Sequence, residues 1–165
     1  MSARLQAPPL PQRRPMSLAD LDEVLAVEHL AYEFPWTRGN FVDSVAAGHG
    51  TQVLRHRDGT LCAYSVAMAG VQEMHLLNLT VAPAWQHRGL ARGLLDVLVA
   101  DSRDRGALWL WLEVRESNQR ARDIYRRYGF AQIGWRRAYY PAAAGLREDA
   151  CVKRLPLGED GHALE

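Results

Sequence analysis

The stretch VAPAWQHRGLARG at residues 81–93 decides the fold, because an apolar strand runs through a proline into a glycine-bearing turn that opens a long helix. Gly89 and Ala91 leave the backbone bare, and the first N–H groups of a helix have no partner within the helix. Aligned peptide dipoles add partial positive charge there, and Arg88 and Arg92 add full charge. The turn therefore predicts a site for a phosphate or pyrophosphate. The alternative is a plain strand-to-helix turn with solvated arginines.

Two other phosphate-binding glycine loops do not fit this turn. A dinucleotide-binding fingerprint needs a third glycine and an acidic residue about twenty positions further on, and the spacing here is wrong. A Walker loop needs the sequence Gly-Lys-Ser/Thr, and this turn contains no lysine. The sequence thus predicts neither a dinucleotide site nor a nucleoside triphosphate site of those kinds.

Composition and charge limit the class of protein. The chain has 165 residues, of which 48% are hydrophobic and 24% are charged, as in an ordinary globular domain. A formal net charge of +1 argues against a general nucleic-acid binder. No apolar run is long enough to cross a bilayer, and the start lacks a signal-peptide pattern, so we expect no membrane partner and a cytoplasmic location. The two cysteines have no metal-ligand spacing, and no metal is expected.

Hydrophobic periodicity and turn signals predict one domain that mixes strands and helices. Asp58-Gly59 between two β-rich runs is a hairpin signal, and glycines end the last two helices at Gly106 and Gly129. We expect this domain to span 12–157, with a proline-containing leader at 1–11 and a polar tail at 158–165. The expected strands are 13–16, 51–57, 60–69, 72–81, 107–114, 130–136 and 149–155; the expected helices are 17–30, 37–47, 89–105 and 119–128, and a long loop separates the last two strands.

A set of motifs in a fixed order carries a family resemblance. Gln86-x-x-Gly89-x-Ala91, after the strand Leu77–Val81, resembles the acetyl-CoA loop of the GCN5-related N-acetyltransferase superfamily, with Ala91 where a second glycine is commoner. The remaining motifs resemble the RimI group of that superfamily, bacterial enzymes that acetylate the N-terminal alanine of small-subunit ribosomal protein eighteen. They are the segments EFPW (33–36), WLWLEVR (109–115), YGF (128–130) and RRAYYP (136–141), together with Asn118 and Tyr125.

This resemblance implies an α/β fold with a central mixed sheet of six to seven strands, flanked by about four helices, in which two central strands splay apart. It also implies acetyl-CoA as the cosubstrate, with its pantetheine arm in that gap, and a protein N-terminus as the acceptor. The residues implied to hold acetyl-CoA are Leu79, Thr80, Val81, His87, Arg88, Gly89, Leu90, Ala91, Arg92 and Asn118.

Aromatic side chains predict where the acceptor binds. The loop with Phe34 and Trp36 is unusually aromatic for a connection, and exposed aromatic residues in a loop suggest a binding edge. Folding of both rings back onto the core is the alternative. The resemblance favours an acceptor groove, for which Glu73, Tyr139 and Tyr140 are further candidates.

Glu113 and Tyr125 are the candidate catalytic residues. Glu113 ends a strand that is apolar on both sides, and a lone carboxylate there needs a reason. Acting through one or two waters, Glu113 can take the proton of the acceptor amine, while the inward-facing Tyr125 can give its phenolic proton to the departing thiolate. A backbone N–H near Val81 would stabilise the carbonyl oxygen. The alternatives are an ion pair of Glu113 with Arg115 or Arg137, Glu73 as the base, and Tyr125 as a core aromatic.

Direct transfer in a ternary complex is the expected reaction, because no serine or cysteine nucleophile is flanked by a persuasive base. A modest base suffices for an α-amino group, since its pKa is roughly 7.7–8.0 against about 10.4 for lysine. Two other functions stay open at this point. One is an acetyltransferase that acts on lysine side chains or on a small amine, and the other is a non-catalytic acetyl-CoA-binding module.

Overall fold

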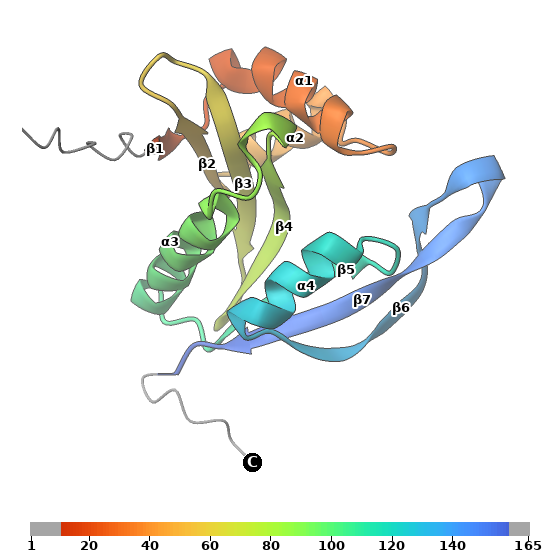
Figure 1. The fold of residues 1–165 in the computed structure, drawn as a ribbon. Helices are drawn as coiled ribbons and strands as arrows, with labels where there is room; N and C mark the ends of the chain where they lie inside the picture. Colours follow the sequence, from red (N-terminus) through yellow and green to blue (C-terminus); the bar gives the residue numbers. More distant parts are fainter. Residues whose placement is uncertain (1–10, 159–165) are drawn as a thin grey trace, which may run out of the picture.

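The computed structural model describes residues 11–158, which form a seven-stranded mixed sheet with helices on both faces (Figure 1). The leader expected at 1–11 and the tail expected at 158–165 lie outside these residues, apart from one residue of each. The strands run in the order β1-β2-β3-β4-β5-β7-β6, and each neighbouring pair is antiparallel except β4 and β5. Their bounds are β1 Gln12–Pro15, β2 Gly50–Arg55, β3 Leu61–Ala69, β4 Glu73–Val81, β5 Trp109–Arg115, β6 Ala131–Pro141 and β7 Arg147–Pro156.

Four α-helices lie close to their expected positions in the described part of the chain. Two of them begin with the expected side-chain caps: Thr37 Oγ1 accepts from the Asn40 N–H at 3.2 Å, and Asn118 Oδ1 accepts from the Ala121 N–H at 3.1 Å. The first α-helix begins at Leu21 and not at Ser17, because Leu18–Asp20 form a 3-10 turn. None of these helices has the length and apolar character needed to cross a bilayer. Their bounds are α1 Leu21–Ala31, α2 Arg38–Ala46, α3 Leu90–Asp104 and α4 Gln119–Tyr128.

Hydrophobic side chains pack on both faces of the sheet, because side chains along each strand alternate between the faces. Helices α1 and α2 cover one face, where the rings of Phe41 and Tyr64 meet edge-on with centroids 5.8 Å apart. Helices α3 and α4 cover the other face, where Leu110 and Leu112 of β5 are buried. The alternation therefore turns Glu113 of β5 away from α3 and α4.

Strands β4 and β5 pair along only part of their length. Their register joins Glu73–Leu76 to Trp109–Leu112 and then stops. A β-bulge lies at that point, because the pairing between β3 and β4 skips Leu77. The bulge bends β4, and the sheet divides into two arms that diverge towards the C-terminal ends of these strands (Figure 1). The splayed pair and the seven-stranded mixed sheet implied by the family resemblance are thus confirmed.

The last two strands are longer than the sequence predicts. Instead of a long loop between 136 and 149, β6 continues to Pro141 and β7 begins at Arg147, so that the hairpin projects beyond the rest of the sheet (Figure 1). The expected loop is wrong because the pairing is irregular rather than absent there. Ala138 has a φ of 49°, and its N–H donates to Asp149 Oδ1 at 2.8 Å, which lets the pairing resume beyond the irregularity. Such a break hides the alternation by which a strand is recognised.

Asp20 anchors the start of α1 as a buried carboxylate whose side chain is 2% exposed. Burial raises its pKa, but hydrogen bonds from Arg14, from the Ser17 backbone N–H and from Arg55 outweigh burial and hold the pKa well below its usual range. A lowered folded-state pKa stabilises the fold above the unfolded pKa of about 3.9, and this stability is lost as the pH falls below that value.

We therefore expect Asp20→Asn to lower the free energy of unfolding by about 2 kcal/mol at neutral pH, because two arginines lose a charged acceptor. The difference from the wild type should shrink as the pH falls below about 4. Urea unfolding at a series of pH values measures both effects. Asp22→Asn is the control, because that side chain is 88% exposed and should contribute little. Equal acid sensitivity of wild type and Asp20→Asn would contradict the expectation.

Candidate active site

The turn before α3 presents a row of free backbone N–H groups. Gly89 is the N-cap residue of α3 with a φ of 79°, and His87 also has a positive φ, of 62°. Within residues 11–158, the first amide of this helix that has a backbone acceptor is that of Gly93, which donates to Gly89 O at 3.1 Å. The amides before it lie at the positive end of the helix dipole. These are the donors that an anion site requires.

The guanidinium of Arg88 turns back to the preceding turn, where it donates to Ala84 O at 3.3 Å and lies 4.6 Å from the ring centroid of Trp85. Arg92 lines a cavity next to Tyr128 that is distinct from the cleft between β4 and β5.

The gap between β4 and β5 contains two adjoining cavities. We call the cavity of about 170 Å³ next to α3 the turn-side cavity, and the cavity of about 310 Å³ next to Glu113 the carboxylate-side cavity. They share lining residues and so form one cleft from the anion turn to Glu113. Of the predicted residues, Leu79, Thr80, Val81, Ala91, Asn118 and Tyr125 line the turn-side cavity, and Phe34, Trp36, Leu79, Glu113, Asn118, Tyr125 and Tyr140 line the other. The remaining predicted cofactor residues, His87, Arg88, Gly89, Leu90 and Arg92, lie next to Ala91 in the turn and at the start of α3.

Strand β4 directs free peptide groups into this cleft. The Ala82 N–H donates to Cys62 O in β3 at 2.8 Å, so alternation along the strand directs the Val81 N–H to the opposite side, where β5 has diverged. Leu79 O accepts a hydrogen bond at 3.3 Å from the hydroxyl of Tyr32, which also lies 2.8 Å from Thr80 Oγ1. The Val81 N–H can therefore pair with an extended ligand or stabilise a developing negative charge on an oxygen.

Glu113 is held at both carboxylate oxygens, and its side chain is 7% exposed. Oε2 lies 2.5 Å from Nε2 of His75 on β4, and Oε1 lies 3.1 Å from Nε of Arg136 on β6. The His75 ring stacks on Trp111, with centroids 3.6 Å apart and planes 10° from parallel. A carboxylate oxygen has two lone pairs, so each oxygen can still accept a proton or a hydrogen bond from the cleft.

Arg115 and Arg137, which the sequence offers as partners of Glu113, bind other carboxylates. Arg115 lies 2.8 Å from Glu148, and Arg137 lies 3.1 Å from Asp149. The alternative ion pair of Glu113 with either arginine is therefore wrong, because β7 brings its own acidic residues alongside both arginines. Sequence separation alone could not reveal that pairing.

Arg115 also joins the aromatic side chains expected around the acceptor. Its Cζ lies 4.5 Å from the ring centroid of Tyr140 and 5.2 Å from that of Phe34, which links the β6–β7 hairpin to the loop before α2 by cation–π contacts. Trp36 packs onto the core under α1 and α2 and still lines the carboxylate-side cavity. Tyr139 is 42% exposed and lies outside the cavity lining. Three of the four predicted aromatic residues thus meet at the cleft.

Tyr125 belongs to the core and to the cleft at once. Its ring packs on Phe130 with centroids 5.4 Å apart and planes at 66°, and the residue is 8% exposed. Burial raises the pKa of its phenol, and the nearby Tyr32 and Tyr140 raise the pKa further. The phenol is therefore protonated at neutral pH, as a proton donor must be.

A buried carboxylate, Glu28, fastens α1 to the floor of the cleft. It is 1% exposed and accepts from the Trp36 N–H at 3.0 Å, from Asn78 Nδ2 at 3.2 Å and from the Tyr64 hydroxyl. The Thr80 hydroxyl extends the network by donating to Asn78 Oδ1 at 2.7 Å. Removal of one member would leave buried polar groups unsatisfied, so this network fixes β4 where it borders the cleft.

Glu73, considered from the sequence as a rival base and acceptor residue, does not reach this cleft. It begins β4, is exposed, and pairs with Trp109, which lies four residues before Glu113 or about 13 Å along the strand. Its side chain lies beside Gly70 in the preceding turn. The end of β4, and not its start, faces the cleft.

Sequence reasoning did not select several residues that the fold brings to the site. Their places in the site depend on the parallel register of β4 and β5 or on the packing of α1, which the sequence does not show. One local signal was available, since strand alternation puts His75 on one face with Glu73 and makes it a candidate to face a polar partner. The residues missed are Glu28, Tyr32, His75, Asn78 and Arg136.

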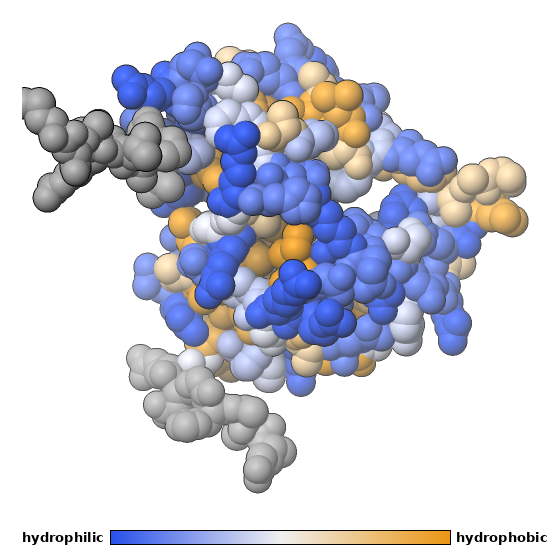
Figure 2. All heavy atoms as spheres, viewed as in Figure 1, coloured by the Kyte–Doolittle hydropathy of each residue, from blue (hydrophilic) through white to orange (hydrophobic). Residues whose placement is uncertain are grey.

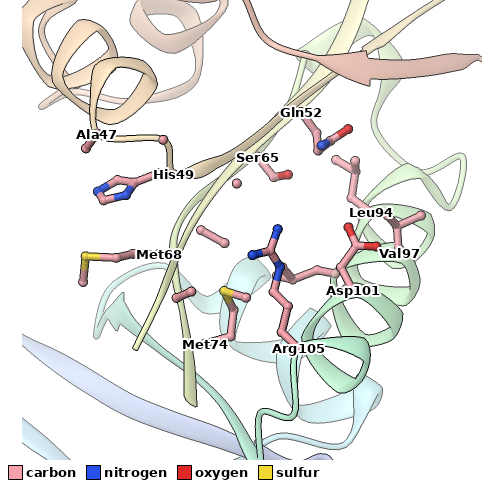
Figure 3. A pocket seen from close by; sticks show the side chains of 15 residues that line it. Ala47, His49, Gln52, Ser65, Met68, Met74, Leu94, Val97, Asp101 and Arg105 are labelled. Carbon is pink, nitrogen blue, oxygen red and sulfur yellow. The ribbon is translucent and has the colours of Figure 1, made fainter. Parts of the chain in front are cut away.

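A separate cavity of about 360 Å³ lies between α3 and strands β2 and β3 (Figure 3). Its lining includes His49, Met74, Asp101 and Arg105, and none of the residues predicted for acetyl-CoA or for the acceptor. With the exception of Arg92, the predicted residues that line a cavity line the cleft between β4 and β5 instead.

The chain is similar to known proteins in both sequence and fold. The acetyltransferase (GNAT) family matches residues 21–130. The chain is 35% identical over 145 residues to the [ribosomal protein bS18]-alanine N-acetyltransferase of Escherichia coli strain K12, with 86% of this chain and 95% of that protein covered. Its counterpart in Haemophilus ducreyi is 35% identical over 138 residues, with 84% and 94% covered. The crystal structure of the Escherichia coli ribosomal-protein-S18-alanine N-acetyltransferase has a TM-score of 0.82 at 33% identity, with 94% and 99% covered.

Proposed function

The chain belongs to the acetyltransferase (GNAT) family, and from this premise we propose that it transfers the acetyl group of acetyl-CoA to the N-terminal alanine of ribosomal protein bS18. The observation that carries the proposal is the cleft that joins the turn at Gly89 to Glu113 and Tyr125. The acceptor is the one named for relatives that match over nearly their whole length. Because that acceptor is a ribosomal protein, we also propose a cytoplasmic location. The net charge of +1 supports the absence of a direct nucleic-acid partner, and no membrane partner is proposed. Residues 12–157 are proposed as the functional unit.

The donors along the cleft fit the chemistry of acetyl-CoA, which supplies an activated acetyl thioester when bound. The amides of residues 87–92 would hold the diphosphate. Arg88 and Arg92 would add positive charge, and Arg88 would have to leave Ala84 O to reach the diphosphate. A peptide group at Leu79 would pair with an amide of the pantetheine arm, which leaves the Val81 N–H for the reacting carbonyl, and Asn118 would border the arm. This arrangement would direct the thioester towards the carboxylate-side cavity.

Gly89→Ala tests the turn, with Gly106→Ala as a matched control. Both glycines flank α3, have a similar positive φ of 79° and 76°, and have open space where a Cβ would lie. Each substitution should cost about 1–2 kcal/mol of stability from backbone strain. Only Gly89→Ala should weaken acetyl-CoA binding, by roughly tenfold, because its methyl group crowds the amides that face the diphosphate. Calorimetric titration with acetyl-CoA measures the difference, and equal affinities would exclude this turn as the diphosphate site.

Glu113 would accept the proton that the attacking amine must lose. Deprotonation of an α-amino group near neutral pH costs only about 1–1.4 kcal/mol, against nearly 5 for a lysine side chain. A carboxylate that acts through one or two waters is a sufficient base for the first of these amines. The position of Glu113, held by His75 and Arg136 at the edge of the cleft, supports this role.

Two further groups would act on the other side of the reacting carbonyl. The Val81 N–H, directed into the gap, would donate to the oxygen on which negative charge develops. Tyr125, whose side chain lines both cavities, would donate its phenolic proton to the departing sulfur. The acceptor peptide would approach along Phe34, Trp36 and Tyr140, with Tyr139 at the rim.

Mass spectrometry after incubation with acetyl-CoA tests the acceptor. The substrates are a peptide with the bS18 N-terminus, the same peptide with a blocked N-terminus and an internal lysine, and a small primary amine. We expect acetylation of the first peptide at its α-amino group. Acetylation of only the lysine or the small amine would overturn the proposed acceptor and leave an acetyltransferase. Tight binding of acetyl-CoA without any transfer would identify a binding module.

A further inference from the structure

His75 lies where two strands from different parts of the sequence meet beside the proposed base. The parallel register pairs His75 with Trp111, and Glu113 follows two residues later on the same face of β5. Nε2 of His75 lies 2.5 Å from Glu113 Oε2, and the side chains are 12% and 7% exposed. The contact is therefore largely shielded from water.

The ring of His75 is fixed by a second contact. It stacks on Trp111 with a centroid separation of 3.6 Å and planes 10° from parallel. Aromatic stacking of this kind restricts rotation about the side-chain torsions of the histidine. An imidazole held in this way presents one nitrogen in one direction, and that nitrogen faces the carboxylate.

The other oxygen of Glu113 is held from the opposite arm of the sheet. Nε of Arg136, on β6, lies 3.1 Å from Oε1, and the guanidinium carbon lies 5.8 Å from the centroid of the Trp111 ring. The terminal torsion of a glutamate is broad and has no strong rotamer preference, so contacts at both oxygens define its direction. The Arg136 side chain is 48% exposed, so His75 is the partner of Glu113 that is better shielded from water.

We propose that His75 is a positioning residue that sets the direction of the Glu113 carboxylate by hydrogen bonding through Nε2, with Trp111 as its support. This inference rests on the proposed function of Glu113 as the base. In the neutral ring, the tautomer with the proton on Nε2 donates to Oε2, which leaves the second lone pair of each oxygen for the cleft. A misdirected base loses rate, because proton transfer depends on a defined geometry.

Two substitutions separate positioning from proton transport. His75→Ala removes the donor, whereas His75→Gln keeps an N–H donor of similar reach that cannot carry a proton at neutral pH. We expect His75→Ala to lower the single-turnover rate by about 10–100-fold and to leave the KM values for acetyl-CoA and peptide within about twofold. His75→Gln should recover most of the lost rate. The control is His49→Gln, at a histidine that lines the other cavity (Figure 3), which should retain the wild-type rate.

Either of two kinetic results would overturn the proposal. A wild-type rate in His75→Ala would show that Glu113 needs no orientation from β4. A loss in His75→Gln as large as in His75→Ala, restored by added imidazole, would make His75 a proton carrier instead.

A measurement without an acceptor keeps this inference separate from the proposed function. Nitrogen-15 spectra of the histidine side chains, with His75 assigned by its absence in His75→Gln, should show a proton on Nε2 that exchanges slowly with water. Removal of the acceptor in Glu113→Ala should shift the resonance and speed the exchange. An identical His75 signal in both proteins would refute the contact. If the wild type transfers acetyl to no amine, the proposed function fails while this spectrum still decides the pairing.

Discussion

Replacement of Glu113 by Gln is expected to lower kcat for the alanine peptide by about 10²–10⁴-fold, the range that a positioned general base contributes. The amide has nearly the shape of the carboxylate and keeps an oxygen for His75, but it cannot take a proton from the amine. The affinity for acetyl-CoA should stay the same, because the diphosphate donors lie at the other end of the cleft. Steady-state kinetics combined with calorimetric binding measures both quantities.

The pH dependence of the rate of the Glu113→Gln variant provides a second test of Glu113 as the base. Without a base, transfer relies on the fraction of amine that is already neutral, so the residual rate should rise about tenfold per pH unit up to the α-amino pKa near 8. Glu116→Gln, at an exposed residue just beyond β5, is the matched control and should keep the wild-type rate. A Glu113→Gln rate within threefold of the wild type at neutral pH would end the assignment of Glu113 as the base.

Tyr125→Phe is expected to lower kcat by about 10²-fold, because the departing thiolate loses its proton donor. The phenyl ring should keep its packing on Phe130, so the change removes chemistry with little effect on the core. Tyr128→Phe is the control on the same helix: its ring also packs on Phe130, at 6.0 Å, but its hydroxyl bonds Asp96 at 2.6 Å, away from the cleft.

Changing the leaving group distinguishes an acid from a packing residue. An acetyl thioester of a more acidic thiol needs less help from a proton donor, so the difference between Tyr125→Phe and the wild type should narrow with that substrate. A deficit of the same size with both thioesters would assign Tyr125 to substrate placement. Equal losses in Tyr125→Phe and Tyr128→Phe would point to helix packing.

The sequence predicts best those features whose physical cause is local. Gly89 at the start of α3, Thr37 and Asn118 as caps, and Gly129 after α4 each follow from backbone geometry or hydrogen bonding within a few residues. The family motifs also predict the sheet as a whole, because the family they resemble has a known order of strands. The fold was therefore predictable from short stretches read in order.

The contacts of the candidate base were not predictable in the same way. The pairing of His75 with Glu113 depends on the register of two strands separated by the whole of α3, and the bulge at Leu77 determines where they part. Arg136 reaches Glu113 only because β6 and β7 fold back along β5. Side-chain periodicity gives the face of one strand but not the offset between strands, so these partners required coordinates.

The β6–β7 hairpin extends past the rest of the sheet and ends in an apolar tip, where Leu146 is 67% exposed (Figure 2). Within the sheet it connects to β1–β4 through β5, which shares four paired positions with β4, and Arg115 links it to the loop before α2. Leu146 at the tip lies outside the lining of both cavities of the cleft, so substitutions there should leave that lining unchanged. The apolar tip can therefore vary in sequence while the residues proposed to hold acetyl-CoA stay the same.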